Sequence, residues 1–227
     1  MKVVILQPGY LPWLGFCDQM YQSDIFVVYD DVQYDKHGWR NRNRIKTAQG
    51  AQWLTVPVLV KGLNKPLIKD VLINNSTDWR RTHLAAITQS YSKAPFFSTF
   101  IGVFEEIYSR QWNYLIDIDM AFIYVIMEKL NLKPGVLFSS KLDVSGSETQ
   151  RLVDICLTLG ATDYLTGDAA KEYITESLFQ DNKIQLSYHN YQHPVYNQLY
   201  GEFIPYLSII DLIFNHGPVH RDILGNR

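Results

Sequence analysis

The chain has 227 residues, a formal net charge of −2 and two cysteines, Cys17 and Cys156. A chain of this length can bury a core without disulfides, so we predict one domain over residues 1–227 in a reducing, cytoplasmic location. The near-neutral charge argues against a nucleic-acid partner, and the apolar runs are too short for a signal peptide or for insertion into a membrane. The sequence does not predict the oligomeric state.

Aromatic residues make up 14% of the chain and include 15 Tyr and 5 Trp. These side chains combine a flat apolar face with a polar tip, which suits contacts with sugars and nucleobases. Packing of a tyrosine-rich core explains the same composition equally well. Both interpretations stay open on composition alone.

The N-terminal segment predicts a strand, a helix and a second strand. Residues 3–6 form an apolar run ended by Gln7-Pro8-Gly9, which is typical of a strand buried on both faces. A helical pattern follows over residues 11–21, and residues 25–29 form a second apolar run. This order is a βαβ unit, and such units give parallel strands. We therefore predict an α/β fold with a Rossmann-like parallel sheet flanked by helices.

The rest of the chain extends this pattern. Residues 52–58 and 66–74 alternate like strands, which predicts a small antiparallel insertion around residues 40–75. Ser145–Glu148 matches a capping box, so we expect a helix to begin there and to end at Gly160. Other expected elements are helices beginning near Asp78, Pro95, residue 114 and Ser208, and short strands over residues 135–138, 164–168 and 184–188.

Ligands of open parallel sheets bind at the carboxyl ends of the strands, where loops and helix N-termini present unpaired N–H groups. The first segment of this kind follows the first strand. Its glycines permit close backbone approach, its prolines fix the turn, and its glutamine both donates and accepts hydrogen bonds. A purely structural turn is the alternative. The candidate ligand-binding residues are Gln7, Gly9, Tyr10, Pro12, Trp13 and Gly15.

The second segment follows the second strand. Its carboxylates can hold a cation or take a proton, and its arginines suit a carboxylate or a phosphate. A turn followed by a solvated basic strand, with residues 40, 42 and 44 on one face, is an equally good interpretation. The candidate catalytic residues are Asp30, Asp31 and His37, and the candidate binding residues are Gln33, Arg42 and Asn43.

The third segment pairs two later strand ends, Ser139-Ser140 and Gly167-Asp168. These four residues are candidates for ligand binding, although helix capping, with Asp168 as the cap of the next helix, explains much of the pattern. We predict no metal site, because Pro194 and Gly217-Pro218 interrupt the histidine pairs at 189/193 and 216/220. Covalent catalysis is not supported either, since no serine or cysteine has a recognisable His and acid partner.

Several of these blocks resemble the signature blocks of the WbqC-like family. The matching blocks are residues 7–15, 30–34, 41–43, 54–58, 91–95, 139–140, 160–167 and 207–215, which together cover nearly the whole chain. The family is associated with bacterial surface polysaccharide (O-antigen) gene clusters. The resemblance implies a role in transferring an aminoacyl group, such as glycine, to an amino sugar.

The first strand and its loop are also similar to the first nucleotide-binding block of class I aminoacyl-tRNA synthetases and related nucleotidyltransferases. Ser139-Ser140 would correspond to the later, phosphate-contacting block. The chain departs from that pattern at Pro12 and Trp13, which replace the histidine side of the motif. This likeness implies nucleotide binding, with ATP and Mg²⁺ as candidate cofactors.

The resulting hypothesis is a transferase or ligase that acts on an amino sugar, with a nucleotide or nucleotide sugar as its small-molecule ligand. We expect Gln7, Asp30 and Ser139 to surround one hollow, with Arg42 binding an anion and Asp30 or Asp31 binding magnesium or acting as a base. The alternatives are a non-catalytic binding protein of the same pathway and a glycosyltransferase.

Overall fold

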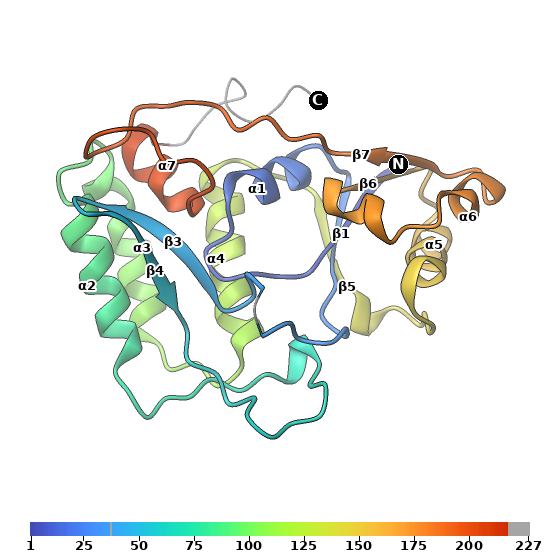
Figure 1. The fold of residues 1–227 in the computed structure, drawn as a ribbon, viewed down its shortest axis with the longest axis horizontal. Helices are drawn as coiled ribbons and strands as arrows, with labels where there is room; N and C mark the ends of the chain where they lie inside the picture. Colours follow the sequence, from blue (N-terminus) through green and yellow to red (C-terminus); the bar gives the residue numbers. More distant parts are fainter. Residues whose placement is uncertain (37, 218–227) are drawn as a thin grey trace.

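A computed structural model describes residues 1–36 and 38–217, so the predicted catalytic residue His37 lies outside the described residues. In these two ranges, five parallel strands form one sheet in the order β5-β2-β1-β6-β7 (Figure 1). This confirms the predicted α/β class. The strands are β1 (Lys2–Leu6), β2 (Ile25–Val28), β5 (Gly135–Phe138), β6 (Asp163–Thr166) and β7 (Gln185–Tyr188).

The strand order reverses beside β1. The chain adds β2 and then β5 on one side of β1, and later returns to add β6 and β7 on the other side. The connections leaving β1 and β6 therefore diverge, and the gap between them is where open α/β sheets bind ligands.

Helices cover both faces of the sheet. α1 (Leu14–Tyr21) and α4 (Leu115–Lys129) lie on one side, and α5 (Glu148–Leu159) and α6 (Glu176–Asp181) lie on the other (Figure 1). Successive residues of a strand point to opposite faces, so Val4 packs with the first helices and Val3 with the second. This double burial accounts for the uninterrupted apolar runs of β1 and β2.

The helices α2 (Trp79–Tyr91), α3 (Phe97–Ser109) and α7 (Ile209–His216) extend the core on the α4 side. Asp78 caps α2 by accepting a hydrogen bond from the backbone N–H of Arg81, as predicted. No described helix combines the length and the apolar character needed to cross a bilayer.

The predicted antiparallel insertion exists as a hairpin of β3 (Arg42–Thr47) and β4 (Gly50–Thr55). Its inner face, which includes Ile45 and Leu54, is buried, and β3 lies against α2 and α7. The strand predicted over residues 66–74 is wrong. That segment contains a short helical turn, η1 (Ile68–Asp70), and is tied by single bridges to Gln33, Val58 and Tyr114.

Two predicted caps are also wrong. α5 begins at Glu148 with Ser147 before it, so Ser145 does not cap the helix, although the helix does end at the left-handed Gly160. Asp168 caps no helix. It starts a short turn, η3 (Asp168–Glu172), and pairs with Lys171 at 2.6 Å.

Candidate functional site

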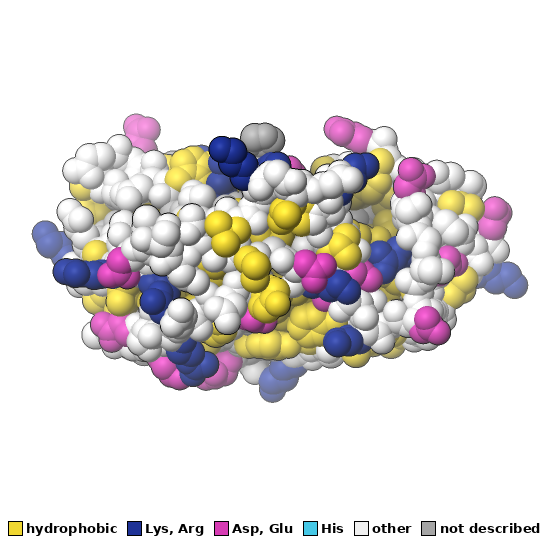
Figure 2. Space-filling view, turned by 90° about the horizontal axis from the view of Figure 1, so that it is seen from below, with side chains coloured by type: hydrophobic (Ala, Val, Ile, Leu, Met, Phe, Trp, Pro, Cys, Tyr) yellow, Lys and Arg dark blue, Asp and Glu magenta, His cyan; other side chains and the backbone are white. Residues whose placement is uncertain are grey.

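A cavity of about 760 Å³ lies at the carboxyl ends of β1 and β6, where the strand order reverses. We call it the hollow. Its volume is that of a site for a small organic ligand. Seen from below the view of Figure 1, the molecule carries hydrophobic side chains near the middle of its surface, with acidic and basic side chains around them (Figure 2). The hollow is lined by Ile5, Leu6, Gln7, Trp13, Phe16, Gln19, Tyr29, Val32, Asp35, Arg40, Glu148, Leu152, Tyr164, Thr166, Gly167, Ala169, Ala170 and Tyr173.

Arg40 supplies the cation of the hollow. Its Nη1 donates to the backbone oxygen of Gln7 at 2.8 Å and lies 3.4 Å from that of Pro8. Burial lowers the pKa of Arg40, and the carboxylates of Asp119 and Asp35 oppose this effect. An arginine stays protonated under such conditions, so the hollow contains a positioned positive charge.

The first predicted segment holds Arg40 in place. The N–H of Tyr10 donates to the backbone oxygen of Arg40 at 2.9 Å. A Cβ at Gly9 would lie 2.9 Å from the backbone oxygen of Trp39, so only glycine permits this close approach. The loop and the segment before β3 are therefore one structural unit.

The other residues of this segment divide into two groups. Gln7 and Trp13 line the hollow. Tyr10 is fully buried, and its hydroxyl bonds to Tyr108 and lies 2.8 Å from Nδ1 of His83, so it is a core residue. Gly15 lies under the ring of Trp13, where any side chain would collide with it. Pro12 accepts a backbone hydrogen bond from Ile209 at 2.9 Å.

Asp30 joins the ends of β2 and β5. Its Oδ1 accepts the N–H of Ser140 at 2.9 Å and lies 3.1 Å from Oγ of Ser139, while its Oδ2 accepts the hydroxyl of Ser140 at 2.6 Å. Only 3% of Asp30 is exposed. Both oxygens thus serve contacts within the protein.

Asp31 lies in the same cluster. Its Oδ1 is 2.5 Å from Oγ of Ser139, and its Oδ2 pairs with Arg151 at 2.5 Å. Burial raises the pKa of Asp31, but the hydrogen bonds from Arg151 and Ser139 outweigh it and hold the pKa below its ordinary value. Arg151 in turn lies over the ring of Tyr29, 5.2 Å from its centroid, and Tyr29 lines the hollow.

The structure therefore brings Asp30, Asp31, Ser139 and Ser140 together, but it places Gln7 in a different cavity. Asp30 and Ser140 line a separate groove of about 670 Å³, whereas Gln7 lines the hollow. The predicted single hollow around Gln7, Asp30 and Ser139 is thus divided by the end of β2.

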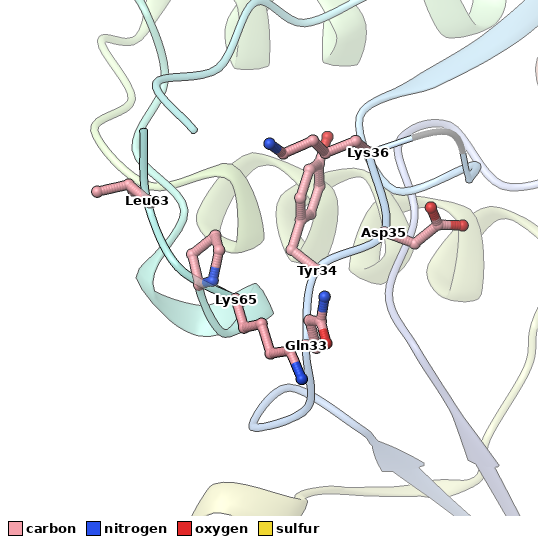
Figure 3. A pocket seen from close by; sticks show the side chains of 7 residues that line it. Gln33, Tyr34, Asp35, Lys36, Leu63 and Lys65 are labelled. Atoms are coloured by element: carbon pink, nitrogen blue, oxygen red, sulfur yellow. The ribbon is translucent and has the colours of Figure 1, made fainter. Parts of the chain in front are cut away.

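The remaining predicted residues are dispersed. Arg42 lies on the outer face of the hairpin, 4.7 Å from the ring centroid of Trp53, and does not line the hollow. Asn43 is buried and donates to the backbone oxygen of Leu11 at 2.6 Å. Gln33 lines a shallow depression next to Tyr34 and Lys65 (Figure 3). Gly167 lines the hollow, whereas Asp168 does not.

Sequence reasoning missed most of the hollow. The missed lining residues that bear polar groups are Gln19, Tyr29, Asp35, Arg40, Glu148, Tyr164, Thr166 and Tyr173. Tyr29 and Thr166 stand at strand ends, which is the signal that could have identified them. Glu148 is the first residue of α5 and Tyr173 directly follows η3, and no local sequence pattern shows that these two positions reach the hollow.

Among the described residues, no group of three or more His, Cys, Asp and Glu side chains is arranged to hold a metal ion. His189 makes a buried pair with Asp18, with 2.5 Å between Nε2 and Oδ2. His193 packs among the rings of Tyr191, Tyr196 and Phe203.

A buried carboxylate that does not line the hollow, that of Asp119, interacts electrostatically with Arg40. Asp119 of α4 is fully buried, and neither carboxylate oxygen has a hydrogen-bond partner among the described residues. Burial raises the pKa of Asp119 well above its ordinary value, and Arg40 lowers it. Asp119 and Arg40 are therefore electrostatically coupled.

Comparison with known proteins finds a family match over nearly the whole chain. Residues 7–223 match the model of the WbqC-like protein family. The chain is 38% identical to the uncharacterized protein Rv1507c of Mycobacterium tuberculosis, over 98% of this chain and 97% of that protein. No solved structure matches the chain.

Proposed function

Since the chain belongs to the WbqC-like protein family, we propose that it is an enzyme of bacterial surface polysaccharide biosynthesis. In this proposal it transfers an aminoacyl group, such as glycine, to an amino sugar that is presented as a nucleotide sugar in the hollow. The observation that carries the proposal is the hollow itself, which lies where the strand order reverses and has Arg40 in its wall.

The lining of the hollow suits a nucleotide sugar. Trp13, Tyr29 and Tyr173 offer aromatic surfaces to a base or a sugar. The guanidinium of Arg40 matches a diphosphate, because its N–H groups form a planar fork. The backbone at Gly167 permits close approach of the ligand at the end of β6.

Aminoacyl transfer needs a base for the attacking amine. When the amine nitrogen bonds to the carbonyl carbon, the bond to the leaving group breaks and the amine gives up a proton. Glu148 lines the hollow, is exposed and has a φ of 54° at the start of α5, a strained conformation of the kind that active sites retain. We assign the base to Glu148, and we assign Asp30 and Asp31 to holding the strand ends.

Ligand binding is the first test. A nucleotide sugar that binds the native protein raises its unfolding temperature, so we expect a thermal shift with amino-sugar nucleotides. Arg40→Gln removes most of the shift, and Arg42→Gln, which changes an arginine outside the hollow, keeps it. The proposal fails if neither nucleotides nor nucleotide sugars shift the unfolding temperature, or if Arg40→Gln binds like the original protein.

Turnover is the second test. Glu148→Gln should bind the nucleotide sugar normally and lose aminoacyl transfer. ATP-dependent transfer releases AMP and pyrophosphate or ADP and phosphate, whereas release of a nucleoside diphosphate identifies a glycosyltransferase. Binding without turnover, with glycine, ATP and Mg²⁺ supplied, identifies a non-catalytic binding protein.

A further inference from the structure

The basic residues of the chain are concentrated in one segment. Between Asp35 and Asp70 the sequence contains eight Lys and Arg residues and no Asp or Glu, although the whole chain has a net charge of −2. These residues are Lys36, Arg40, Arg42, Arg44, Lys46, Lys61, Lys65 and Lys69. The function proposed above uses one of them, Arg40.

Part of this segment is a loop that exposes leucines and lysines alternately. In residues 59–65, which we call the basic loop, Leu59 is 49% exposed and Leu63 is 52% exposed. Lys61 and Lys65 are exposed between and beyond them. Positive φ angles at Gly62 and Lys65 turn the loop. Its base is fixed where the N–H of Leu59 donates to Leu72 at 2.8 Å.

The basic loop forms one wall of a depression of about 400 Å³ (Figure 3). Leu63 and Lys65 come from the loop, and Lys36 comes from the segment after β2. The acidic residue of this depression is Asp35, which also lines the hollow. The depression and the hollow are therefore neighbours.

We propose that the basic loop docks the protein onto an anionic phospholipid surface. Leu59 and Leu63 enter the headgroup region, and Lys36, Lys61 and Lys65 bind lipid phosphates. Two observations favour this occupant. Lys36, Lys61 and Lys65 outnumber the single carboxylate of the depression, Asp35, and a net positive surface complements a negative one. Exposed leucines between lysines gain contacts in the boundary between headgroups and acyl chains. Nucleic acid would use the same cations and leave the leucines in water.

The docked orientation has a consequence for the hollow. Because Asp35 belongs to both cavities, docking of the basic loop brings the mouth of the hollow close to the lipid headgroups. The docking proposal does not depend on which ligand the hollow binds, so each can fail without the other.

Co-sedimentation of the full chain with lipid vesicles tests the proposal. We expect the protein to sediment with vesicles that contain phosphatidylglycerol, to sediment far less with pure phosphatidylcholine, and to be released by high salt. Each lysine near an anionic surface is worth about fivefold in partitioning. Lys61→Gln with Lys65→Gln should therefore lower binding by about 25-fold.

Substitution of the two leucines distinguishes docking into the headgroup region from purely electrostatic attraction to the vesicle. Leu59→Ser with Leu63→Ser should also lower vesicle binding several-fold at constant charge. The matched controls are Leu157→Ser on α5, where the leucine is 47% exposed, and Lys133→Gln, an exposed lysine outside the basic segment. Both controls should bind vesicles normally, and thermal unfolding confirms that all variants are folded.

Three results would overturn the proposal. They are equal sedimentation with neutral and anionic vesicles, full binding by the Leu59→Ser/Leu63→Ser variant, and binding of single-stranded RNA in place of vesicles.

Discussion

Ser140 holds the buried carboxylate of Asp30 through two hydrogen bonds, one from its backbone N–H and one from its hydroxyl. Asp30 follows β2 and Ser140 follows β5, so these bonds fix the relative positions of two neighbouring strand ends. Asp30, which the sequence indicated as a candidate catalytic residue, thus makes structural contacts within the protein.

The first prediction concerns this pair. Ser140→Ala removes the hydroxyl that donates to Oδ2 of Asp30, which leaves this buried carboxylate oxygen without that hydrogen bond. We expect a loss of about 2 kcal/mol in the free energy of unfolding, measured in urea. Ligand binding in the hollow should survive, because neither residue lines it. Unchanged stability together with lost turnover would instead support Asp30 as the catalytic residue.

The sequence predicted the sheet because its signal is local. The apolar runs of β1 and β2 indicate burial on both faces of the sheet, and Gly160 indicates a helix that ends in the left-handed conformation. The strand expected over residues 66–74 failed for the opposite reason. Its alternation reflects separate contacts with Gln33, Val58 and Tyr114, which are distant in sequence.

The candidate site was predictable only in part. The alternation of Arg40, Arg42 and Arg44 predicted one shared face, but β3 begins at Arg42. Arg40 precedes the strand, and the backbone of residues 7–10 turns it into the hollow. No local sequence pattern predicts the contact between Arg40 and the backbone of residues 7–10. The sequence therefore indicated Arg42, whereas the structure places Arg40 in the hollow.

The second prediction concerns the buried pair of Asp18 and His189, which connects α1 with the end of β7. Each side chain is 3% exposed. Removing one member of such a pair leaves its partner buried and unpaired, which costs about 3 kcal/mol. We expect Asp18→Ala to lower the free energy of unfolding by that amount. The control is Asp143→Ala, which changes an exposed aspartate and should have little effect.

The third prediction is a pH dependence caused by His83. Burial lowers the pKa of His83 from 6.5 to about 4. Between these values the unfolded chain binds a proton that the folded chain does not, so stability falls as the pH drops from 6.5 toward 4. A shift of this size corresponds to about 3 kcal/mol.

His83→Gln tests this origin. The variant should show a smaller difference in unfolding free energy between neutral and acid solution than the original protein. Burial also lowers the pKa of His193, but by less, so His193→Gln should reduce the acid dependence to a smaller extent than His83→Gln. If His83→Gln keeps the full acid dependence, the dependence arises from other groups.

The fourth prediction concerns Asp119, whose carboxylate is buried without a hydrogen-bond partner among the described residues. The pKa of Asp119 is raised in the folded chain. Above pH 3.8, the ordinary pKa of an aspartate, the unfolded chain therefore loses a proton that the folded chain still binds. Asp119 therefore destabilises the protein increasingly toward neutral pH. We expect Asp119→Asn to raise the free energy of unfolding by about 1 kcal/mol or more at neutral pH, and the gain to shrink in acid.

Proteins retain such costly groups where function needs them. Because Asp119 is coupled to Arg40, we expect the more stable Asp119→Asn variant to bind the ligand of the hollow with altered affinity. Urea unfolding and ligand titration on the same samples give both quantities. A less stable variant would contradict the stability prediction, and unchanged affinity at every pH would show that Asp119 does not act on the hollow through Arg40.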